Sequence, residues 1–134
     1  MTADYTAVTR GIEVGVQTFY LEEQSDPDAG TWVWAYRVRI ENGGTETVQL
    51  LRRTWRITDA QGKLDLVEGP GVVGEQPVLR PGEVFEYTSG TPLRTPSGFM
   101  EGSYGMTIPE TGEKFDAAVP AFSLDSPHVA RRLH

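Results

Sequence analysis

The chain has 134 residues, no cysteine and a formal net charge of −7 at pH 7. This length predicts one domain over residues 1–134, and the lack of cysteine excludes disulfides and thiol catalysis and fits a reducing, cytoplasmic location. The acidic balance and the lack of a long apolar run argue against partners such as nucleic acid or a membrane.

Apolar and polar residues alternate with a period of two along most of the chain, which is typical of β-strands. In residues 31–42, Trp32, Trp34 and Tyr36 share one face and are expected in the core. In residues 63–68 the same pattern predicts that Leu64 and Leu66 point inward. Strands are predicted, in chain order, over residues 11–21, 31–42, 48–59, 63–68, 83–89, 99–108 and 114–124.

These seven segments are separated by turn signals, and no stretch is typical of a crossover helix. They predict an all-β fold, an antiparallel β-sandwich of the immunoglobulin-like or fibronectin type III-like kind. A small barrel is the alternative, because the pattern does not say how the sheets close. We expect the core over about residues 11–124, with residues 1–10 and 125–134 as flexible ends or short caps.

A glycine-rich stretch, GPGVVGEQP, occupies residues 69–77 and has the G-x-G-x-x-G spacing of dinucleotide-binding loops. Such a loop needs a helix that begins at its last glycine and points its amides at the phosphate. Pro77 and Pro81 leave no room for that helix, and Glu75 would repel a phosphate. The glycines are therefore expected to let the chain turn between sheet edges.

The same stretch is a candidate surface for a protein partner. Its two valines are unusually apolar for a loop, so they either fold onto the sandwich or form an exposed patch. The candidate loop consists of Gly69, Gly71, Val72, Val73, Gly74, Glu75 and Gln76.

Other chemical signals are sparse. The two histidines, His128 and His134, lie in the C-terminal tail, where a catalytic imidazole would not be held in place. We therefore expect no catalytic residues, no metal site and no cofactor. Candidate contacts for a small anion are Arg53, Arg80 and Arg94.

Several long stretches resemble the bacterial ApaG family over nearly the whole chain. They are TRGIEV, YLEEQSDP, WAYRVRIEN, VQLLRRTWRITDAQG, VVGEQPVL and VPAFSLDSP. The resemblance implies a fold similar to fibronectin type III domains, an association with cobalt resistance and magnesium efflux, and eukaryotic relatives that act as protein-interaction modules. The family has no agreed catalytic residues, and its glycine motif is present here as Gly69, Gly71 and Gly74.

The sequence and the resemblance together favour a non-catalytic protein-interaction module with an indirect role in cobalt resistance and magnesium efflux. A domain that senses a nucleotide, a diadenosine polyphosphate or a divalent ion is the alternative. Exposed sheet edges also make a homodimer an expectation.

Overall fold

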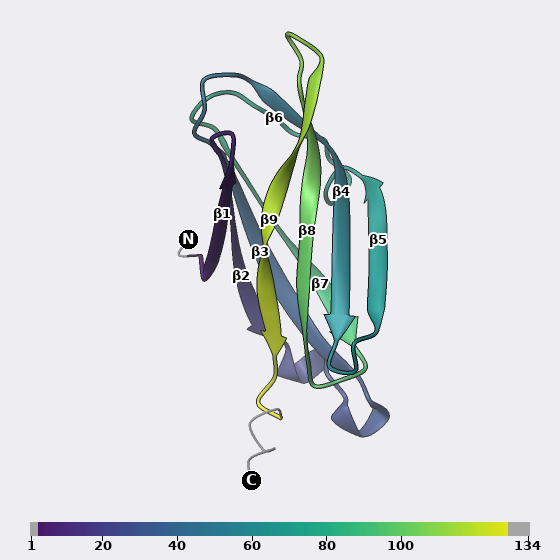
Figure 1. Cartoon of the computed structure of the whole chain (residues 1–134). Helices are drawn as coiled ribbons and strands as arrows, with labels where there is room; N and C mark the ends of the chain where they lie inside the picture. Colours follow the sequence, from purple (N-terminus) through teal and green to yellow (C-terminus); the bar gives the residue numbers. More distant parts are fainter. Residues whose placement is uncertain (1–2, 129–134) are drawn as a thin grey trace.

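Residues 3–128 are described by the structure, which is a computed structural model. They form two antiparallel sheets, one with the strand order β1-β2-β3-β7 and one with the order β5-β4-β8-β9, to which β6 adds beside β4 (Figure 1). The predicted all-β sandwich is confirmed. The elements are β1 (Tyr5–Thr9), β2 (Ile12–Tyr20), β3 (Trp32–Asn42), β4 (Val48–Asp59), β5 (Leu64–Pro70), β6 (Val78–Leu79), β7 (Val84–Leu93), β8 (Ser97–Ile108), β9 (Glu113–Asp125) and the 3₁₀ helices η1 (Glu22–Gln24) and η2 (Pro27–Ala29).

The core lies between the sheets and is built from the inward positions of the strands. Trp34 and Tyr36 are buried there, as the alternation predicts, whereas Trp32 is half-buried at the end of the sandwich. The Tyr36 and Trp55 rings pack edge to face with centroids 5.4 Å apart, which is a favourable arrangement for aromatic rings. Buried aliphatic and sulfur-containing side chains complete the core, among them Ile12, Val14, Val16, Val38, Ile40, Leu50, Met100 and Met106.

The N-terminal residues correct the prediction of a flexible end. Residues 5–9 form β1, which pairs with β2 from Tyr5↔Val16 to Thr9↔Ile12. The strand was missed because its inward positions, Tyr5, Ala7 and Thr9, give only a weak apolar signal. The two-residue β6, which the sequence also did not predict, lies between Pro77 and Pro81.

The described part of the C-terminal segment is attached to the sandwich. The indole Nε1 of Trp34 donates to the backbone oxygen of Asp125 over 3.0 Å, and the Ser126 amide donates to Pro96 O over 3.2 Å. Residues 129–134 of the predicted flexible tail lie outside the described residues.

Strand β5 has the opposite face inward from the one predicted. Leu64 and Leu66 are 55% and 58% exposed, so the prediction that they point inward is wrong. Asp65 and Val67 occupy the inner face instead, opposite Ile57 and Trp55 of β4. Alternation with a period of two does not say which of the two faces of a strand points inward. In a central strand the more apolar face is buried, but in an edge strand, which is covered on fewer sides, it can remain exposed.

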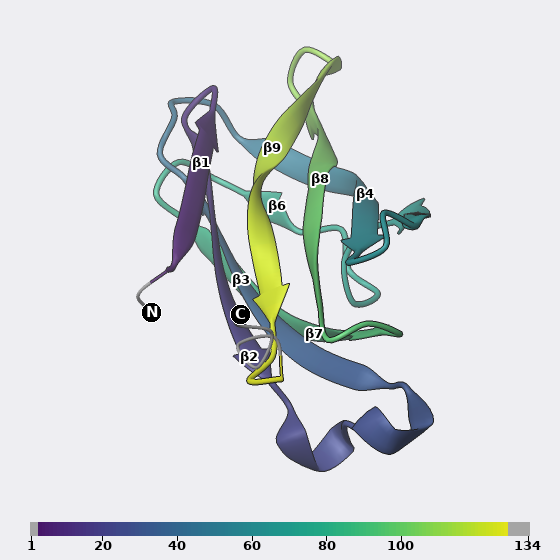
Figure 2. The ribbon, with the colours of Figure 1, turned by 60° about the horizontal axis from the view of Figure 1, so that its bottom comes forward.

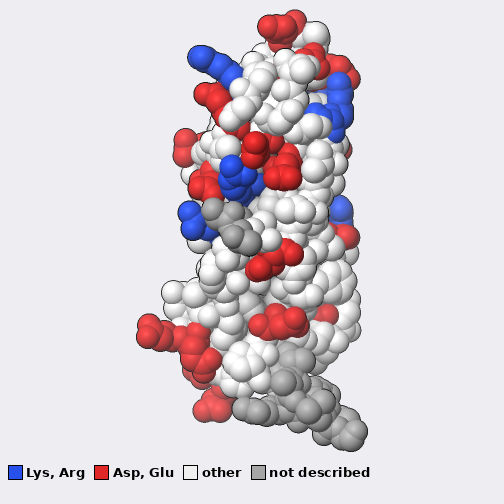
Figure 3. Space-filling model, turned by 90° about the vertical axis from the view of Figure 1, so that its left-hand side faces the viewer, with Lys and Arg blue, Asp and Glu red and all other residues white. Residues whose placement is uncertain are grey.

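The sandwich has a closed side, where β1 and β9 meet, and an open side, where β5 and β7 lie apart. On one side β1 lies beside β9 (Figure 2), where the backbone amides of Ala118 and Ser123 donate to Thr9 Oγ1 and to the Tyr5 hydroxyl over 3.0 and 3.4 Å. This closed side carries acidic side chains along its length, with basic ones among them in the upper half of the view (Figure 3). On the other side the edge strands β5 and β7 are separated by a groove.

Candidate binding groove and glycine loop

The glycine-rich stretch folds into a very short hairpin. The backbones of Val72 and Glu75 exchange two hydrogen bonds of 2.8 and 2.9 Å. Between them Val73 has φ 43° and Gly74 has φ 82°, the positive values that a two-residue hairpin turn requires. No helix follows Gly74, as the prolines predict.

Glycine is needed in this hairpin where two backbone segments approach closely. Gly71 has φ 61°, and a Cβ atom placed on it would lie 2.2 Å from Glu75 O, so no side chain fits there. The amides of Gly71, Val72 and Glu75 already donate to Leu51 O, Glu75 O and Val72 O. Because these three amides have protein acceptors, the loop lacks the set of converging donors that holds a phosphate.

The candidate partner-binding loop is divided between core and surface. Val72 is fully buried and Val73 is 54% exposed, so each of the two alternatives drawn from the sequence applies to one valine. Gly71 is also buried and Gly69 is half-buried, while Gly74, Glu75 and Gln76 are exposed. The Gln76 side chain donates to Leu51 O over 2.9 Å, which attaches the hairpin to β4.

The three arginines proposed as anion contacts do not form one site. Arg80 and Arg94 lie at opposite ends of β7, on the order of 30 Å apart for an extended strand of this length. Arg53 lies on β4, where its Nη1 donates to Pro70 O and Gly71 O over 3.0 Å each. Among residues 3–128, no carboxylate lies within ion-pair distance of Arg53.

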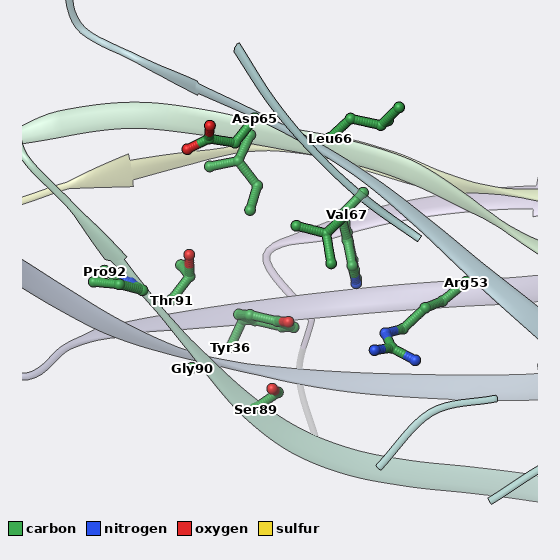
Figure 4. Close-up of a pocket in the computed structure, with 11 residues that line it drawn as sticks. Tyr36, Arg53, Asp65, Leu66, Val67, Ser89, Gly90, Thr91 and Pro92 are labelled. Atoms are coloured by element: carbon green, nitrogen blue, oxygen red, sulfur yellow. The ribbon is translucent and has the colours of Figure 1, made fainter. Parts of the chain in front are cut away.

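A groove of about 510 Å³ separates β5 from β7 on the open side of the sandwich. Arg53 and Asp65 lie toward its two ends, with Val67 between them, and Leu66 points away from it (Figure 4). It continues into a second hollow of about 540 Å³ that shares Ile57, Asp65 and Pro92 and reaches Arg94. The first hollow is lined by Tyr36, Arg53, Trp55, Ile57, Asp65, Leu66, Val67, Ser89, Gly90, Thr91 and Pro92.

Tyr36, which lines this groove, and the core residues Tyr87 and Tyr104 are neutral tyrosines. Burial raises the pKa of Tyr36, and a hydrogen bond with Ser89 and the charge of Arg53 offset this only in part. Burial also raises the pKa of Tyr87 and of Tyr104, whose hydroxyls are hydrogen-bonded to each other in the core. The charge lining the first hollow therefore comes from Arg53 and Asp65.

The outer edge of β5 has no strand beside it in the described part of the chain. The Gly71 amide donates to Leu51 O and the Lys63 oxygen accepts from Asp59, so residues 63 and 71 direct their backbone groups toward β4. Because this direction alternates along a strand, the N–H and C=O groups of Leu64, Leu66 and Glu68 point away from β4. We call these groups the free edge of β5.

The free edge is flanked by apolar side chains. Leu64 and Leu66 are on the outer face, and Val67, 39% exposed, is on the groove face. Phe99 on β8, 45% exposed, shares the outer face, because it is paired with Thr58, which in turn is paired with Leu64. A long edge strand with exposed leucines is a site where another strand can add.

Residues 3–128 contain neither a clustered metal site nor a membrane-spanning helix. No group of three or more histidine, aspartate or glutamate side chains there is arranged to hold a metal ion. In the same residues, no helix has the length and apolar character needed to cross a bilayer.

Known proteins resemble this chain in sequence and in structure. The family model of the ApaG domain matches residues 22–108. Protein ApaG of Rhodospirillum centenum is 66% identical over 128 residues, covering 96% of this chain and 98% of that protein. Protein ApaG of Paramagnetospirillum magneticum is 64% identical over 130 residues, covering 97% and 99%.

Solved structures agree with this fold. A crystal structure of a Bordetella pertussis protein described as ApaA has a TM-score of 0.82 and 44% identity, and the match covers 94% of this chain and 98% of that one. The C-terminal domain of wzt has a TM-score of 0.54 and 13% identity, with 90% and 76% covered, and shares the fold alone.

Proposed function

The chain belongs to the ApaG family, and from that premise we propose that it is a non-catalytic domain that binds a partner protein at the free edge of β5. One observation carries the proposal: the same edge strand exposes outward backbone groups and two leucines, Leu64 and Leu66. Strand addition gains affinity from main-chain hydrogen bonds and specificity from side-chain pockets. The groove beside Val67 is such a pocket.

The edges of β7 and β9 are less suited to strand addition. The Asn42 amide donates to Glu83 O, so by alternation Glu86, Thr88 and Pro92 direct their backbone groups to the outer edge of β7. Proline has no N–H to offer, and Glu86 lies 3.7 Å from Arg37, so this edge carries the features that protect edge strands. The edge of β9 is covered by the side chains of β1.

The glycine loop extends this binding surface. It continues directly from β5, and its turn holds Val73 exposed in a left-handed conformation that a β-branched residue adopts at a cost. An exposed valine kept in such a conformation supports a role in contact with the partner. The loop's exposed part, residues 73–76, is therefore a secondary contact in this proposal.

Other roles follow from this one. A contribution to cobalt resistance and magnesium efflux would be indirect and would run through the partner protein, in the cytoplasm. Sensing of a nucleotide or diadenosine polyphosphate has less support, because the loop amides are occupied and Arg53, Arg80 and Arg94 are apart.

A proline substitution tests the free edge directly. Glu68→Pro removes one outward N–H and leaves the β5–β4 hydrogen bonds in place, and Thr88→Pro does the same on the edge of β7. We expect tagged Glu68→Pro to lose the proteins that wild type captures, whereas Thr88→Pro keeps them. Circular dichroism and thermal melting confirm that both variants fold. If both variants capture the wild-type set, β5 is not the docking edge.

A further inference from the structure

We infer that β5 also pairs with β5 of a second copy of this chain, antiparallel and centred on Val67, and that this homodimer covers the edge used by the partner. The inference rests on the proposed function insofar as both use the free edge of β5. It follows from the backbone directions of β5, from the two charged groups of the groove and from the exposed leucines.

The backbone of β5 allows this register. In an antiparallel pair centred on residue 67, residue 66 lies opposite residue 68 of the second copy, and residue 64 lies opposite residue 70. All these residues direct their backbone groups outward, so they can exchange hydrogen bonds, except that Pro70 only accepts. Figure 1 shows β5 at the rim of the molecule with no segment beyond it.

The charged groups on the inner face, Asp65 and Arg53, can pair with the same two groups of a second copy. Asp65 and Gly69 lie two residues to either side of Val67, so Asp65 of each copy would lie opposite Gly69 of the other. The Arg53 guanidinium occupies the space above Gly69: a Cβ atom placed there would be 3.1 Å from Nη1. Each Asp65 would thus meet the Arg53 of the other copy, at the distance of a directly opposed side-chain pair.

Arg53 is suited to receive such a carboxylate. Its Nη1 is held by Pro70 O and Gly71 O, and its remaining donors have no carboxylate in ion-pair range within residues 3–128. A half-buried guanidinium fixed in place loses little side-chain entropy when it binds an anion. Because such a homodimer has two-fold symmetry, the ion pair between Asp65 of one copy and Arg53 of the other would form twice.

The outer face is compatible with the same register. Leu64 would lie opposite Pro70, and the two Leu66 side chains would be diagonal neighbours, within reach of each other. Leu66 of each copy would also lie opposite Glu68 of the other, whose methylene groups can pack on it, so the leucines of both copies would be partly covered. Each copy carries a net charge of −7, but at physiological salt the Debye length of about 8 Å screens the general repulsion more than the close ion pair.

A charge reversal at Asp65 distinguishes the effect of the local ion pair on dimerisation from the effect of general charge repulsion. In analytical ultracentrifugation of the full chain, from low micromolar to millimolar concentration, we expect wild type to dimerise. Asp65→Lys should weaken the dimer by at least about tenfold, although it lowers the net negative charge, because Lys would face Arg53. Glu13→Lys makes the same change of charge on the outer face of the other sheet and should leave dimerisation unchanged or slightly stronger.

Cysteine cross-linking tests the register. The chain has no native cysteine, and Val67→Cys would place two sulfurs at a pair whose Cα atoms are about 4.5 Å apart, a distance that a disulfide accepts. Under mild oxidation we expect Val67→Cys to cross-link at least tenfold faster than Leu66→Cys or, on β7, Val84→Cys. The cross-linked dimer should no longer capture the partner proteins.

The results distinguish this inference from the proposed function. A chain that is monomeric at millimolar concentration, or cross-links equally at all three positions, overturns the homodimer. The proposed function then still stands if Glu68→Pro loses the captured proteins. If Val67→Cys cross-links selectively and Glu68→Pro captures the wild-type set, the homodimer stands and the proposed docking edge is wrong.

Discussion

The β1–β9 side and the β5–β7 side of the sandwich end their sheets in different ways. On the first, side chains of β1 accept from the backbone amides of Ala118 and Ser123, and the Arg10 and Glu113 side chains form an ion pair of 2.7 Å. On the second, the sheets diverge around a groove of about 510 Å³, and Leu64 and Leu66 are exposed.

The difference shows where this chain leaves an edge accessible. Free edges with apolar side chains promote aggregation, and proteins usually protect them with proline, charge or a covering segment. Here β7 has Pro92 and Glu86, and β9 has β1 over it, whereas β5 carries leucines beside its free edge. Strand β5 also carries Glu68 and Pro70, so its two exposed leucines, and not a lack of charge or proline, distinguish its edge from that of β7. This difference supports the proposed binding role of the β5 edge.

The largest effect is expected for core residues on the closed side. Phe122→Ala, at a side chain 1% exposed, should lower the free energy of unfolding by about 3–5 kcal/mol. Ile57→Ala on the open side should cost less than half as much, because Ile57 is partly buried and borders the groove, where water fills the space left. Urea denaturation measures both. Equal losses would mean that the open side is packed like the core.

The next effect concerns the hairpin beside the open edge. Gly71→Ala should lower the free energy of unfolding by about 2–3 kcal/mol, since positive φ and a clash with Glu75 O act together. Gly74→Ala is the matched control: it has φ 82° but no atom within 4 Å of the added Cβ, so a loss of about 1–2 kcal/mol is expected. A smaller loss at Gly71 than at Gly74 would contradict this geometry.

The sequence predicted the fold well because the closed core imposes a simple pattern. Strands that bury one face must alternate, and Trp34, Tyr36 and Val38 of β3 do so without interruption. Strand β1 was not predicted because Ala7 and Thr9 give little apolar signal. Thr9 nevertheless supplies the hydroxyl that accepts from the Ala118 amide of β9. A hydrogen bond between residues more than a hundred positions apart leaves no local trace in the sequence.

The candidate site could be predicted only in part. Pro77 correctly excluded a helix after Gly74, because the effect of proline on its neighbours is local. The groove residues Tyr36, Asp65 and Ser89 were missed, since they come from three different strands and only the sheet topology brings them together. Arg53 was selected for its charge, but its orientation depends on the carbonyls of the loop.

A smaller change in the free energy of unfolding, and one that stabilises the fold, is expected at Val73. Val73→Asn should raise the free energy of unfolding by about 1 kcal/mol, because asparagine tolerates the positive φ that a β-branched residue resists. Val78→Asn, at another exposed valine but in an ordinary strand conformation, should give no gain. Denaturation of both variants, with partner capture alongside, would show whether stability rises while binding falls. A Val73→Asn variant no more stable than wild type contradicts the assigned strain.

The smallest effect is expected for the Arg10–Glu113 ion pair on the closed side. The hydrogen bond and charge of Arg10 hold the pKa of Glu113 below its usual value, so the pair stabilises the fold above the carboxyl's unfolded pKa and is lost as pH falls through its folded pKa. Arg10→Gln should return the pKa of Glu113 toward its usual value, as measured by NMR titration of the side-chain carboxyl. Both groups are exposed, so the change in stability should be slight, and Arg94→Gln serves as a control for net charge. An unchanged Glu113 titration in Arg10→Gln would show that this pair does not fasten the closed side, leaving that task to Thr9 and Tyr5.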